Sequence, residues 1–186
     1  MPDIFIIAGP NGAEKTTAAY NLLPEVFKTV EFVNADEIAK GLSPLNPEGV
    51  AFQSGRIMLQ RLEQLIIEQR SFAFETTLSG LAYLNFLNQA KMQGYSITLF
   101  FVWLNSYNLA KERVASRVRK GDHNIPPDVI ERRYAKGLQN FNVYAELADS
   151  WYIYNNSEAR YQLVAKYIQG DREIFNFDVL YKIIGE

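Results

Sequence analysis

A short run of residues near the start of the chain could bind a phosphate group. Its members are Gly9, Pro10, Asn11, Gly12, Ala13, Glu14, Lys15, Thr16 and Thr17. Their spacing follows the phosphate-binding pattern G-x-x-x-x-G-K-[ST] at every position except that of Glu14. In such loops the main-chain N–H groups and the start of the next helix bind phosphates, the lysine reaches the β- and γ-phosphates, and the following hydroxyl binds Mg²⁺. We therefore predict that Lys15 contacts the phosphates of ATP and that Thr16 is the metal ligand.

Glu14 stands where the pattern has glycine. Glycine suits this position because it tolerates unusual dihedral angles and lets the main chain approach the phosphate closely. A glutamate adds a side chain to that space, and its carboxylate repels a polyphosphate. The carboxylate could also pair with Lys15, or it could turn out into solvent. We expect the chain to bind ATP poorly and its activity to be impaired.

Two carboxylates follow other apolar segments of the chain. Asp36 comes directly after a short apolar run, where it could accept the proton of a substrate hydroxyl that attacks the γ-phosphate. It could equally cap the helical turn that follows, and the local sequence leaves both roles open. Glu75 ends an apolar strand, beside two threonines, where it could hold Mg²⁺ through water or bind substrate hydroxyls. A surface carboxylate is the alternative for Glu75, which the apolar strand before it disfavours.

Several arginines occur between positions 113 and 133. Arg113 and Arg117 are four residues apart and share one helix face, so they could clamp a phosphoryl group during its transfer. A solvated helix face is the alternative. Arg132 and Arg133, in the next helix, fit either role. The polar segment between the two helices, about 117–127, is predicted to be a lid, because such segments exclude water and complete phosphate sites.

The elements that must hold these residues alternate along the chain. We expect strands over 3–8, 30–33, 72–75, 96–104 and 151–154, an edge strand over 162–167, and helices over 15–23, 37–41, 47–69, 81–93, 105–119, 127–150 and 177–184. This order predicts one α/β domain over 1–186 with three layers, a mostly parallel sheet covered by helices on both faces, as in P-loop kinases. Ligands bind outside the carboxyl ends of such strands, so the phosphate loop, Asp36, Glu75 and Thr77 should converge on one crevice.

The composition narrows the class of protein. The chain has 186 residues, 48% of them hydrophobic and 22% charged, which is typical of a globular protein with a sizeable core. A net charge of −2 argues against nucleic acid as the main partner. The absence of cysteine and the single histidine exclude disulfides, thiolate metal sites and histidine clusters. With no apolar run of ~18 residues and no visible signal peptide, we expect no membrane partner and a cytoplasmic protein.

Four motifs in this order resemble the zeta-toxin family of P-loop small-molecule kinases. They are Ala8-Gly9-Pro10-Asn11-Gly12-Ala13 with Lys15-Thr16-Thr17, Phe32-Val33-Asn34-Ala35-Asp36-Glu37-Ile38-Ala39, Phe74-Glu75-Thr76-Thr77-Leu78-Ser79-Gly80, and Gly121 with His123-Asn124-Ile125-Pro126 before Arg132-Arg133-Tyr134. The resemblance covers residues 4 to about 141. It implies ATP and Mg²⁺ as cofactors, Asp36 as the base, Glu75 and Thr77 near the substrate, and arginines of the 113–117 helix over the phosphates. It also implies a UDP-linked amino sugar such as UDP-N-acetylglucosamine as acceptor and a protein antitoxin as an expected partner.

The chain also departs from this family at three places. Glu14 and Asp122 stand where relatives have glycine, and Leu78-Ser79-Gly80 follows Glu75 where the toxins carry an arginine. These departures leave two alternatives to the sugar-nucleotide kinase. One is a kinase that resembles the chloramphenicol phosphotransferases. The other is a non-catalytic or inactivated P-loop protein that acts by binding a partner, which Glu14 favours.

Overall fold

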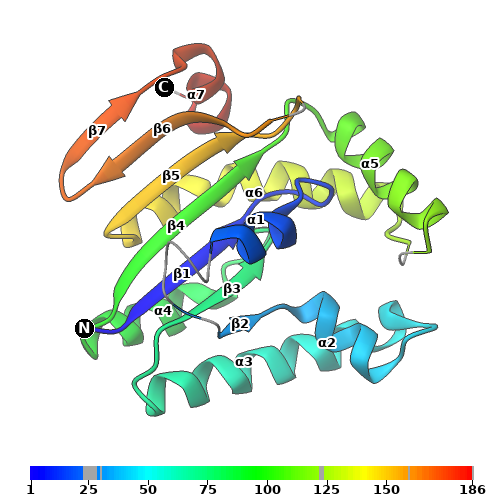
Figure 1. Ribbon diagram of the computed structural model, residues 1–186, viewed down its shortest axis with the longest axis horizontal. Helices are drawn as coiled ribbons and strands as arrows, with labels where there is room; N and C mark the ends of the chain where they lie inside the picture. Colours follow the sequence, from blue (N-terminus) through cyan, green and yellow to red (C-terminus); the bar gives the residue numbers. More distant parts are fainter. Residues whose placement is uncertain (23–28, 30, 122–123, 159, 186) are drawn as a thin grey trace.

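A seven-stranded sheet forms the centre of the protein, as Figure 1 shows for the computed structural model, which describes residues 1–22, 29, 31–121, 124–158 and 160–185. The strands are β1 (Asp3–Ala8), β2 (Phe32–Val33), β3 (Phe72–Thr76), β4 (Ser96–Trp103), β5 (Ser150–Asn155), β6 (Gln162–Ile168) and β7 (Asp171–Ile174). Their order across the sheet is β2-β3-β1-β4-β5-β6-β7. The first five strands of that order pair in parallel, and β6 and β7 continue the sheet antiparallel.

The strand β1 lies in the middle of the parallel part because its sequence is apolar on both faces. Ile4, Ile6 and Ile7 are fully buried, as expected for a strand covered on both sides. The register pairs Ala8 with Thr76 on one side and with Phe101 on the other, so β1 and β3 end together and β4 continues to Trp103. The strand β3 lies on one side of β1, and the next strand in the sequence, β4, lies on the other. Open α/β sheets bind ligands beside a strand where the order changes side in this way.

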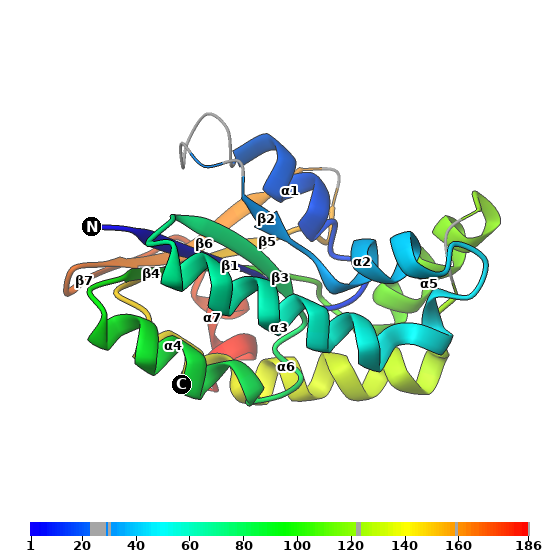
Figure 2. The same ribbon diagram turned by 90° about the horizontal axis from the view of Figure 1, so that it is seen from below.

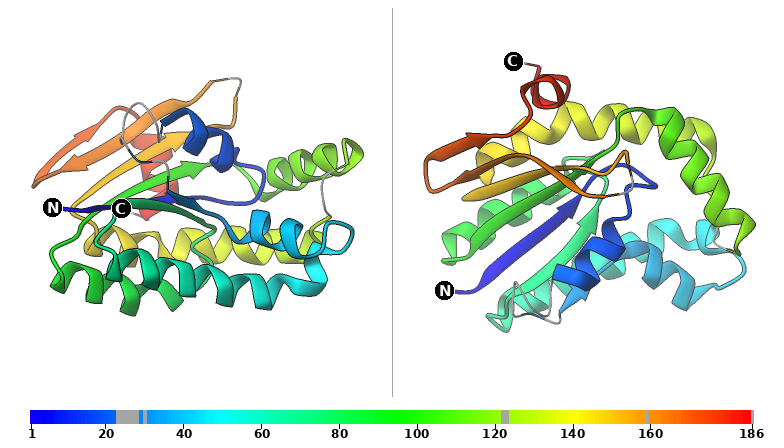
Figure 3. Two further views of the ribbon diagram at one scale, coloured as in Figure 1. Left: turned by 60° about the horizontal axis from the view of Figure 1, so that its bottom comes forward. Right: turned by 45° about the horizontal axis from the view of Figure 1, so that its top comes forward.

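Helices cover the two faces of the sheet unequally. They are α1 (Lys15–Leu22), α2 (Ala35–Leu42), α3 (Ala51–Ile67), α4 (Ala82–Met92), α5 (Tyr107–Arg119), α6 (Pro127–Leu147) and α7 (Phe177–Ile184). Figure 2 shows α1 on one face and α3, α4, α6 and α7 on the other. Figure 3 shows α2 and α5 beyond the carboxyl ends of the strands, where they flank the end of β1. In the described ranges, no helix has both the length and the apolar character needed to cross a membrane.

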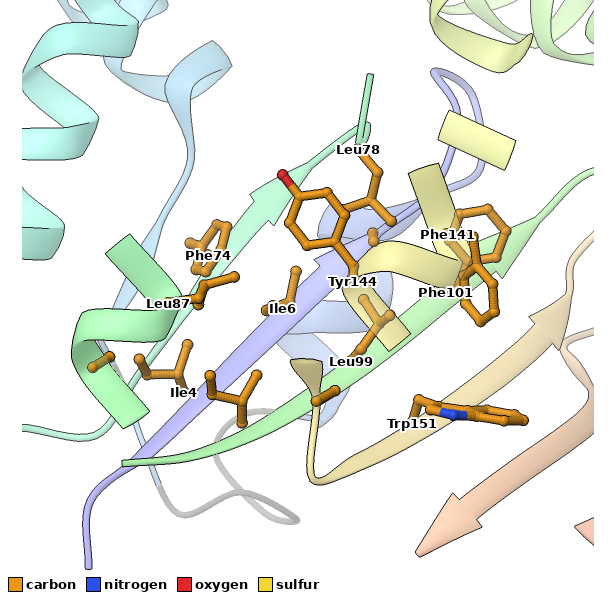
Figure 4. Packing of buried hydrophobic residues seen from close by; sticks show 14 of the residues in the cluster. Ile4, Ile6, Phe74, Leu78, Leu87, Leu99, Phe101, Phe141, Tyr144 and Trp151 are labelled. Atoms are coloured by element: carbon orange, nitrogen blue, oxygen red, sulfur yellow. The ribbon is translucent and has the colours of Figure 1, made fainter. Parts of the chain in front are cut away.

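The larger core lies between the sheet and its four-helix face. Ile6, Phe74 and Phe101 of the strands face Phe141 and Tyr144 of α6 in Figure 4. The rings of Phe101 and Phe141 have centroids 5.0 Å apart in a tilted arrangement. Burial of large side chains of this kind contributes about 1.5–3 kcal/mol each. This packing fixes the strands against α6, and both supply residues to the site described below.

The predicted α/β fold with a mostly parallel sheet is confirmed, and the differences are local. The expected helix over 47–69 begins as a 3-10 turn, η1 (Pro47–Val50), and α2 is longer than the turn predicted over 37–41. The helix expected to reach Ser150 ends at Leu147, because the Asp149 carboxylate bonds instead to the Ile97 N–H (2.8 Å) and Lys91 (2.8 Å). Leu23 and Val30, assigned to a helix and a strand, lie outside the described residues.

The prediction that β6 is an edge strand is wrong. A further strand, β7, pairs with β6 through a tight turn in which Gln169 and Gly170 both have positive φ, 51° and 102°. Two such residues in succession form the turn that suits the twist of a β-hairpin. The polar sequence Asp171-Arg172-Glu173 gives β7 little strand character, so only the pairing reveals it.

Candidate active site

The phosphate loop joins β1 to α1, and its glycines are required by the neighbouring main chain. Gly9 has φ +142°, and a Cβ atom there would lie 2.2 Å from the Val102 carbonyl oxygen of β4. Gly12 has φ +77°, and a Cβ atom there would lie 3.0 Å from the Ala110 carbonyl oxygen of α5. Only glycine fits either place without displacing backbone. The loop is therefore held between β4 and α5.

Glu14 keeps the backbone conformation expected of a glycine. Its φ is +62°, in the left-handed region that costs a side-chain-bearing residue about 1–2 kcal/mol. The Glu14 carboxylate accepts a hydrogen bond of 3.2 Å from the Thr17 hydroxyl on the first turn of α1. The carboxylate therefore does not pair with Lys15, which is one of the two arrangements that the sequence allows. It lies instead at the edge of the loop, next to Thr16 and Thr17.

A compact network joins the loop to the ends of β2 and β3. The Lys15 ammonium donates to the Pro10 carbonyl (3.0 Å) and lies 3.4 Å from a Glu75 oxygen. The other Glu75 oxygen accepts from the Thr16 hydroxyl (2.7 Å) and from the Asn34 side-chain amide (2.9 Å). Lys15 and Glu75 are 6% and 11% exposed, so the pair is shielded from water. One carboxylate thus occupies the partners that a phosphate and a metal ion would use.

Three carbonyl groups of the loop are held by side chains from distant segments. Arg113 of α5 donates to the Gly12 carbonyl (3.4 Å), Asn156 after β5 to the Ala13 carbonyl (3.0 Å), and the Tyr161 hydroxyl to the Glu14 carbonyl (3.0 Å). Arg113 also donates to the Ser157 carbonyl at 3.4 Å. The Ala13 N–H also donates to the Pro10 carbonyl at 3.3 Å. These contacts together hold the backbone of the loop in one conformation.

Asp36 is the second residue of α2 and is exposed to solvent. The role of N-cap, left open for Asp36 from the sequence, belongs to Asn34, whose side-chain oxygen accepts from the N–H groups of Asp36 (2.8 Å) and Glu37 (3.4 Å). Capping in this way is a common use of asparagine. Among the described residues, the structure gives the Asp36 carboxylate no hydrogen-bond or ion-pair partner. The carboxylate is therefore available to a ligand.

The loop after β3 is braced by α6. Asn140 donates to the Leu78 carbonyl and Tyr144 to the Gly80 carbonyl, both at 2.7 Å. A Cβ atom on Gly137 would lie 2.6 Å from the Thr77 carbonyl oxygen, so the close approach of α6 depends on that glycine. The Thr77 hydroxyl bonds to the Ser79 hydroxyl at 2.9 Å. The rigid helix thus fixes the two hydroxyl groups beside Glu75.

A first cavity of about 190 Å³ lies over the phosphate loop. The loop contributes Asn11, Gly12, Glu14, Lys15, Thr16 and Thr17, α2 and the residue before it contribute Asn34, Asp36, Glu37 and Lys40, and the remaining walls are Glu75, Val114, Arg117 and Ile125. Its lining is mostly polar and includes the cations Lys15 and Arg117. Such a cavity suits a polyphosphate.

A second cavity of about 210 Å³ adjoins the first, and a third of about 380 Å³ adjoins the second. Hydroxyl-bearing residues of the second are Thr76, Thr77, Ser79 and Tyr83. The third has apolar walls that include Pro47, Val129 and Ile125, and it also contains Arg132. Asp36 lines all three cavities, and Arg133 lines the second and third. The first two cavities share five residues, which are Asn11, Lys15, Asn34, Asp36 and Glu75.

The structure brings together most of the residues singled out from the sequence. Of the two arginines expected to clamp phosphate, Arg117 lines the first cavity, whereas Arg113 contacts the loop carbonyl described above. In the segment expected to be a lid, α5 ends at Arg119 and α6 begins at Pro127, and Asp122 and His123 lie outside the described residues.

Some site residues were missed by sequence reasoning. Asn34 had a detectable signal, since an asparagine three residues before a glutamate is a typical helix start. Asn156 and Tyr161 had none, because their roles depend on contacts across 143 and 147 residues of sequence. Tertiary structure alone identifies these two residues.

Comparison with known proteins places the chain among P-loop kinase folds. Residues 1–162 match the family described as Zeta toxin. An uncharacterized protein of Haemophilus influenzae is 28% identical over 127 residues, which are 68% of this chain and 88% of that protein. A chain of the AvrRxo1-ORF1:AvrRxo1-ORF2 complex, solved with sulphate ions, superimposes with a TM-score of 0.80 at 18% identity. That match covers 99% of this chain and 64% of the AvrRxo1 chain, so the present chain spans about two thirds of its length.

Two further solved structures agree on the fold. The AvrRxo1 complex solved with ATP matches with a TM-score of 0.77 at 18% identity, over 99% of this chain and 64% of that chain. A chain from the PezAT chromosomal toxin-antitoxin system of Streptococcus pneumoniae matches with a TM-score of 0.69 at 14% identity, over 99% of this chain and 78% of that chain. At these identities the likeness concerns the architecture, which extends over nearly the whole chain.

Proposed function

The chain belongs to the zeta-toxin family, a family of P-loop phosphotransferases, and from this premise we propose that it transfers the γ-phosphate of ATP to a hydroxyl of a sugar nucleotide such as UDP-N-acetylglucosamine. The observation that carries the proposal is the junction of the first and second cavities. A phosphate loop borders one cavity, hydroxyl-bearing residues border the other, and Lys15, Asp36 and Glu75 line both. Phosphoryl transfer requires two substrates to meet at one such boundary.

The first cavity has the groups that a nucleotide triphosphate needs. The start of α1 and the N–H groups of the loop would bind the phosphates, and Lys15 would exchange Glu75 for phosphate oxygens. Thr16 and Glu75 fit Mg²⁺, because their oxygens are 2.7 Å apart at the cavity wall and magnesium prefers oxygen ligands. When bound, Mg²⁺ would neutralise charge on the β- and γ-phosphates. Arg117 would add a second cation over the phosphates, which supports its role as a clamp.

The second and third cavities have the groups that a hydroxylated acceptor needs. Asp36 would accept the proton of the attacking hydroxyl, and the Thr77 hydroxyl would hold a neighbouring sugar hydroxyl with Glu75. Arg132 and Arg133, at the third cavity, would pair with the diphosphate of a sugar nucleotide. Arg133 borders both cavities, so it would lie between the sugar and the rest of the acceptor. An acceptor that spans both cavities agrees with the proposed substrate.

Glu14 is the observation that favours a second candidate, a non-catalytic P-loop protein. The Glu14 carboxylate borders the first cavity, where it would repel a polyphosphate. The main chain already has the shape that a glycine would give it, so the impairment we propose is chiefly one of charge and bulk. Replacing one residue would then restore nucleotide binding.

We propose that the segment 117–127 acts as a lid. This is supported by the presence of Arg117 and Ile125, near its two ends, on the wall of the first cavity.

We also propose a protein antitoxin as partner, as in the PezAT toxin-antitoxin system. Arrest of bacterial growth on expression of Glu14→Gly, relieved by an antitoxin expressed with it, tests the partner. Normal growth with Glu14→Gly would contradict it.

The deciding experiment measures ADP release from Mg-ATP by this chain and by Glu14→Gly, with and without candidate acceptors. We expect release by Glu14→Gly only when a sugar nucleotide is present, with a new phosphate resonance on the acceptor by ³¹P NMR. Lys15→Met in the Glu14→Gly background is the matched inactive control. Release that no acceptor stimulates would indicate an ATPase. Nucleotide binding without any transfer would favour the non-catalytic candidate.

A further inference from the structure

The side chain of Asn11 is buried in the phosphate loop. Asn11 is 6% exposed, and no donor reaches its Oδ1 atom within the described part of the chain. Buried polar groups are nearly always paired, so an unpaired one requires an explanation, such as a ligand that is absent. Two other buried asparagines near the loop have side-chain partners, since Asn34 caps α2 and donates to Glu75, and Asn156 donates to the Ala13 carbonyl. Asn11 differs from both.

The backbone beside Asn11 is fixed, so its side chain cannot easily turn elsewhere. The carbonyl of the preceding residue, Pro10, accepts from Lys15 at 3.0 Å. The following residue, Gly12, has φ +77° and is packed against α5. The side chain between these two points lines both the first and the second cavity. It therefore lies at the boundary between the phosphate loop and the acceptor cavity.

Asn11 differs chemically from the other four residues at that boundary. Lys15 and Glu75 pair with each other, and Asn34 is bonded through both ends of its amide. Asp36 carries a carboxylate, which can only accept hydrogen bonds at neutral pH. Asn11 adds a neutral carboxamide, which presents either its oxygen or, after half a turn about χ2, its nitrogen in the same place. Of the five shared residues, it is the neutral one whose carboxamide oxygen has no partner among the described residues, and the half turn about χ2 would place the nitrogen there as a donor.

We propose that the Asn11 side-chain amide donates a hydrogen bond to an oxygen of the γ-phosphoryl group of ATP, and that it is a catalytic residue for the transfer. This inference rests on the proposed kinase function. The γ-phosphoryl group is the part of ATP that must lie between the two cavities. Charge spreads over its oxygens as it moves, and a fixed donor aimed at them stabilises the transition state. A neutral amide does so without displacing Lys15 from its own phosphate contact.

The test compares Mg-ATP with Mg-ADP, because only ATP carries the γ-phosphate. Dissociation constants are measured by calorimetry for Asn11→Asp and Asn11→Ala, in this chain and in the Glu14→Gly background. We expect Asn11→Asp to weaken ATP binding by about tenfold or more and to change ADP binding by less than about twofold, because a carboxylate repels the γ-phosphate. Asn11→Ala should weaken ATP binding less. Asn142→Asp, the same change on an exposed part of α6, is the matched control and should alter neither.

The outcomes separate this inference from the proposed function. Equal loss of ATP and ADP affinity in Asn11→Asp, or no loss of either, would overturn the role of Asn11 while leaving the kinase intact. If neither the chain nor Glu14→Gly bound ATP or ADP, the proposed function would fail and this role with it. Thermal unfolding of Asn11→Ala should match that of its parent, since the described part of the chain gives the Oδ1 atom of this side chain no hydrogen bond that the change would remove.

Discussion

The side-chain amide of Asn156 donates a hydrogen bond of 3.0 Å to the main-chain carbonyl of Ala13, across 143 residues of sequence. Both residues are buried, at 6% and 0% exposure. The bond ties the segment after β5 to the centre of the phosphate loop. With the similar bonds from Arg113 and Tyr161, it fixes the loop before any nucleotide arrives.

Replacing Asn156 should therefore loosen the loop. We expect Asn156→Leu to lower the free energy of unfolding by about 1–3 kcal/mol, because the Ala13 carbonyl would remain buried without a donor. Nucleotide affinity should fall with it in the Glu14→Gly background. Urea unfolding and calorimetry measure the two effects. Asn142→Leu removes an exposed hydrogen bond of 3.2 Å to the Ile184 carbonyl, which water can replace, so it should lower stability less than Asn156→Leu. Equal stability of the two variants would show that the bond does not support the loop.

Asp36 should act in the chemical step and contribute little to nucleotide binding. In the Glu14→Gly background, we expect Asp36→Asn to lower turnover roughly 10²-fold or more while the dissociation constant for ATP stays the same. Asparagine keeps the shape of the side chain but cannot take a proton at this step. Steady-state kinetics and calorimetry together test this. Unchanged turnover would limit Asp36 to holding the substrate.

Two substitutions of Glu14 should separate charge from bulk. Glu14→Gln removes the carboxylate but keeps the side chain and the left-handed backbone of φ +62°. Glu14→Gly removes the carboxylate, the rest of the side chain and the strain of the left-handed backbone. We expect calorimetry to show Mg-ATP binding tighter by about tenfold or more for glutamine, and tighter still for glycine, because like charges about 4 Å apart repel by about 1 kcal/mol in water and by several times that in a partly buried site. Tight and equal ATP binding by all three proteins would contradict the proposed impairment.

The Tyr144 hydroxyl should make stability sensitive to alkaline pH. Burial, and to a lesser degree the neighbouring Tyr83, raises the pKa of Tyr144 from 10.0 to about 12. The folded state therefore keeps a proton that the unfolded state loses. This raised pKa contributes about 2–3 kcal/mol to the free energy of unfolding. The contribution is fully present below pH 10 and is lost as the pH rises to about 12. Between pH 10 and 12, the free energy of unfolding of Tyr144→Phe should therefore fall by about 2–3 kcal/mol less than that of the parent. If the free energies of unfolding of the two proteins fell by the same amount over this pH range, the prediction would be wrong.

The proposed lid should respond to substrates. Hydrogen exchange of the amides of Arg117–Gly121 should slow when Glu14→Gly binds a non-hydrolysable ATP analogue together with an acceptor, because Arg117 would close over the phosphates. Amides of α4, which lies on the far side of the core, serve as the internal control. Unchanged exchange in the lid segment with both ligands bound would remove the basis for calling it a lid.

Local patterns in the sequence determine the groups that follow each parallel strand. The apolar run of β1, the loop after it, and the residues Asp36, Glu75 and Thr77 can all be recognised without a structure. Parallel strands end at one edge of a sheet, so their convergence also follows from the order of the elements. The family could be identified in the same way, because its motifs are contiguous and occur in a fixed order.

Contacts between distant segments were decided only by the tertiary structure. The sequence could not tell whether Glu14 pairs with Lys15, because Glu75 occupies that position only once β3 lies beside β1. It also left open whether Asp36 caps α2, and the structure shows that Asn34 is the cap. The unpaired amide of Asn11 is likewise invisible in a motif. Hydrogen bonds of this kind depend on positions within a few tenths of an ångström, and packing of the whole chain sets those positions.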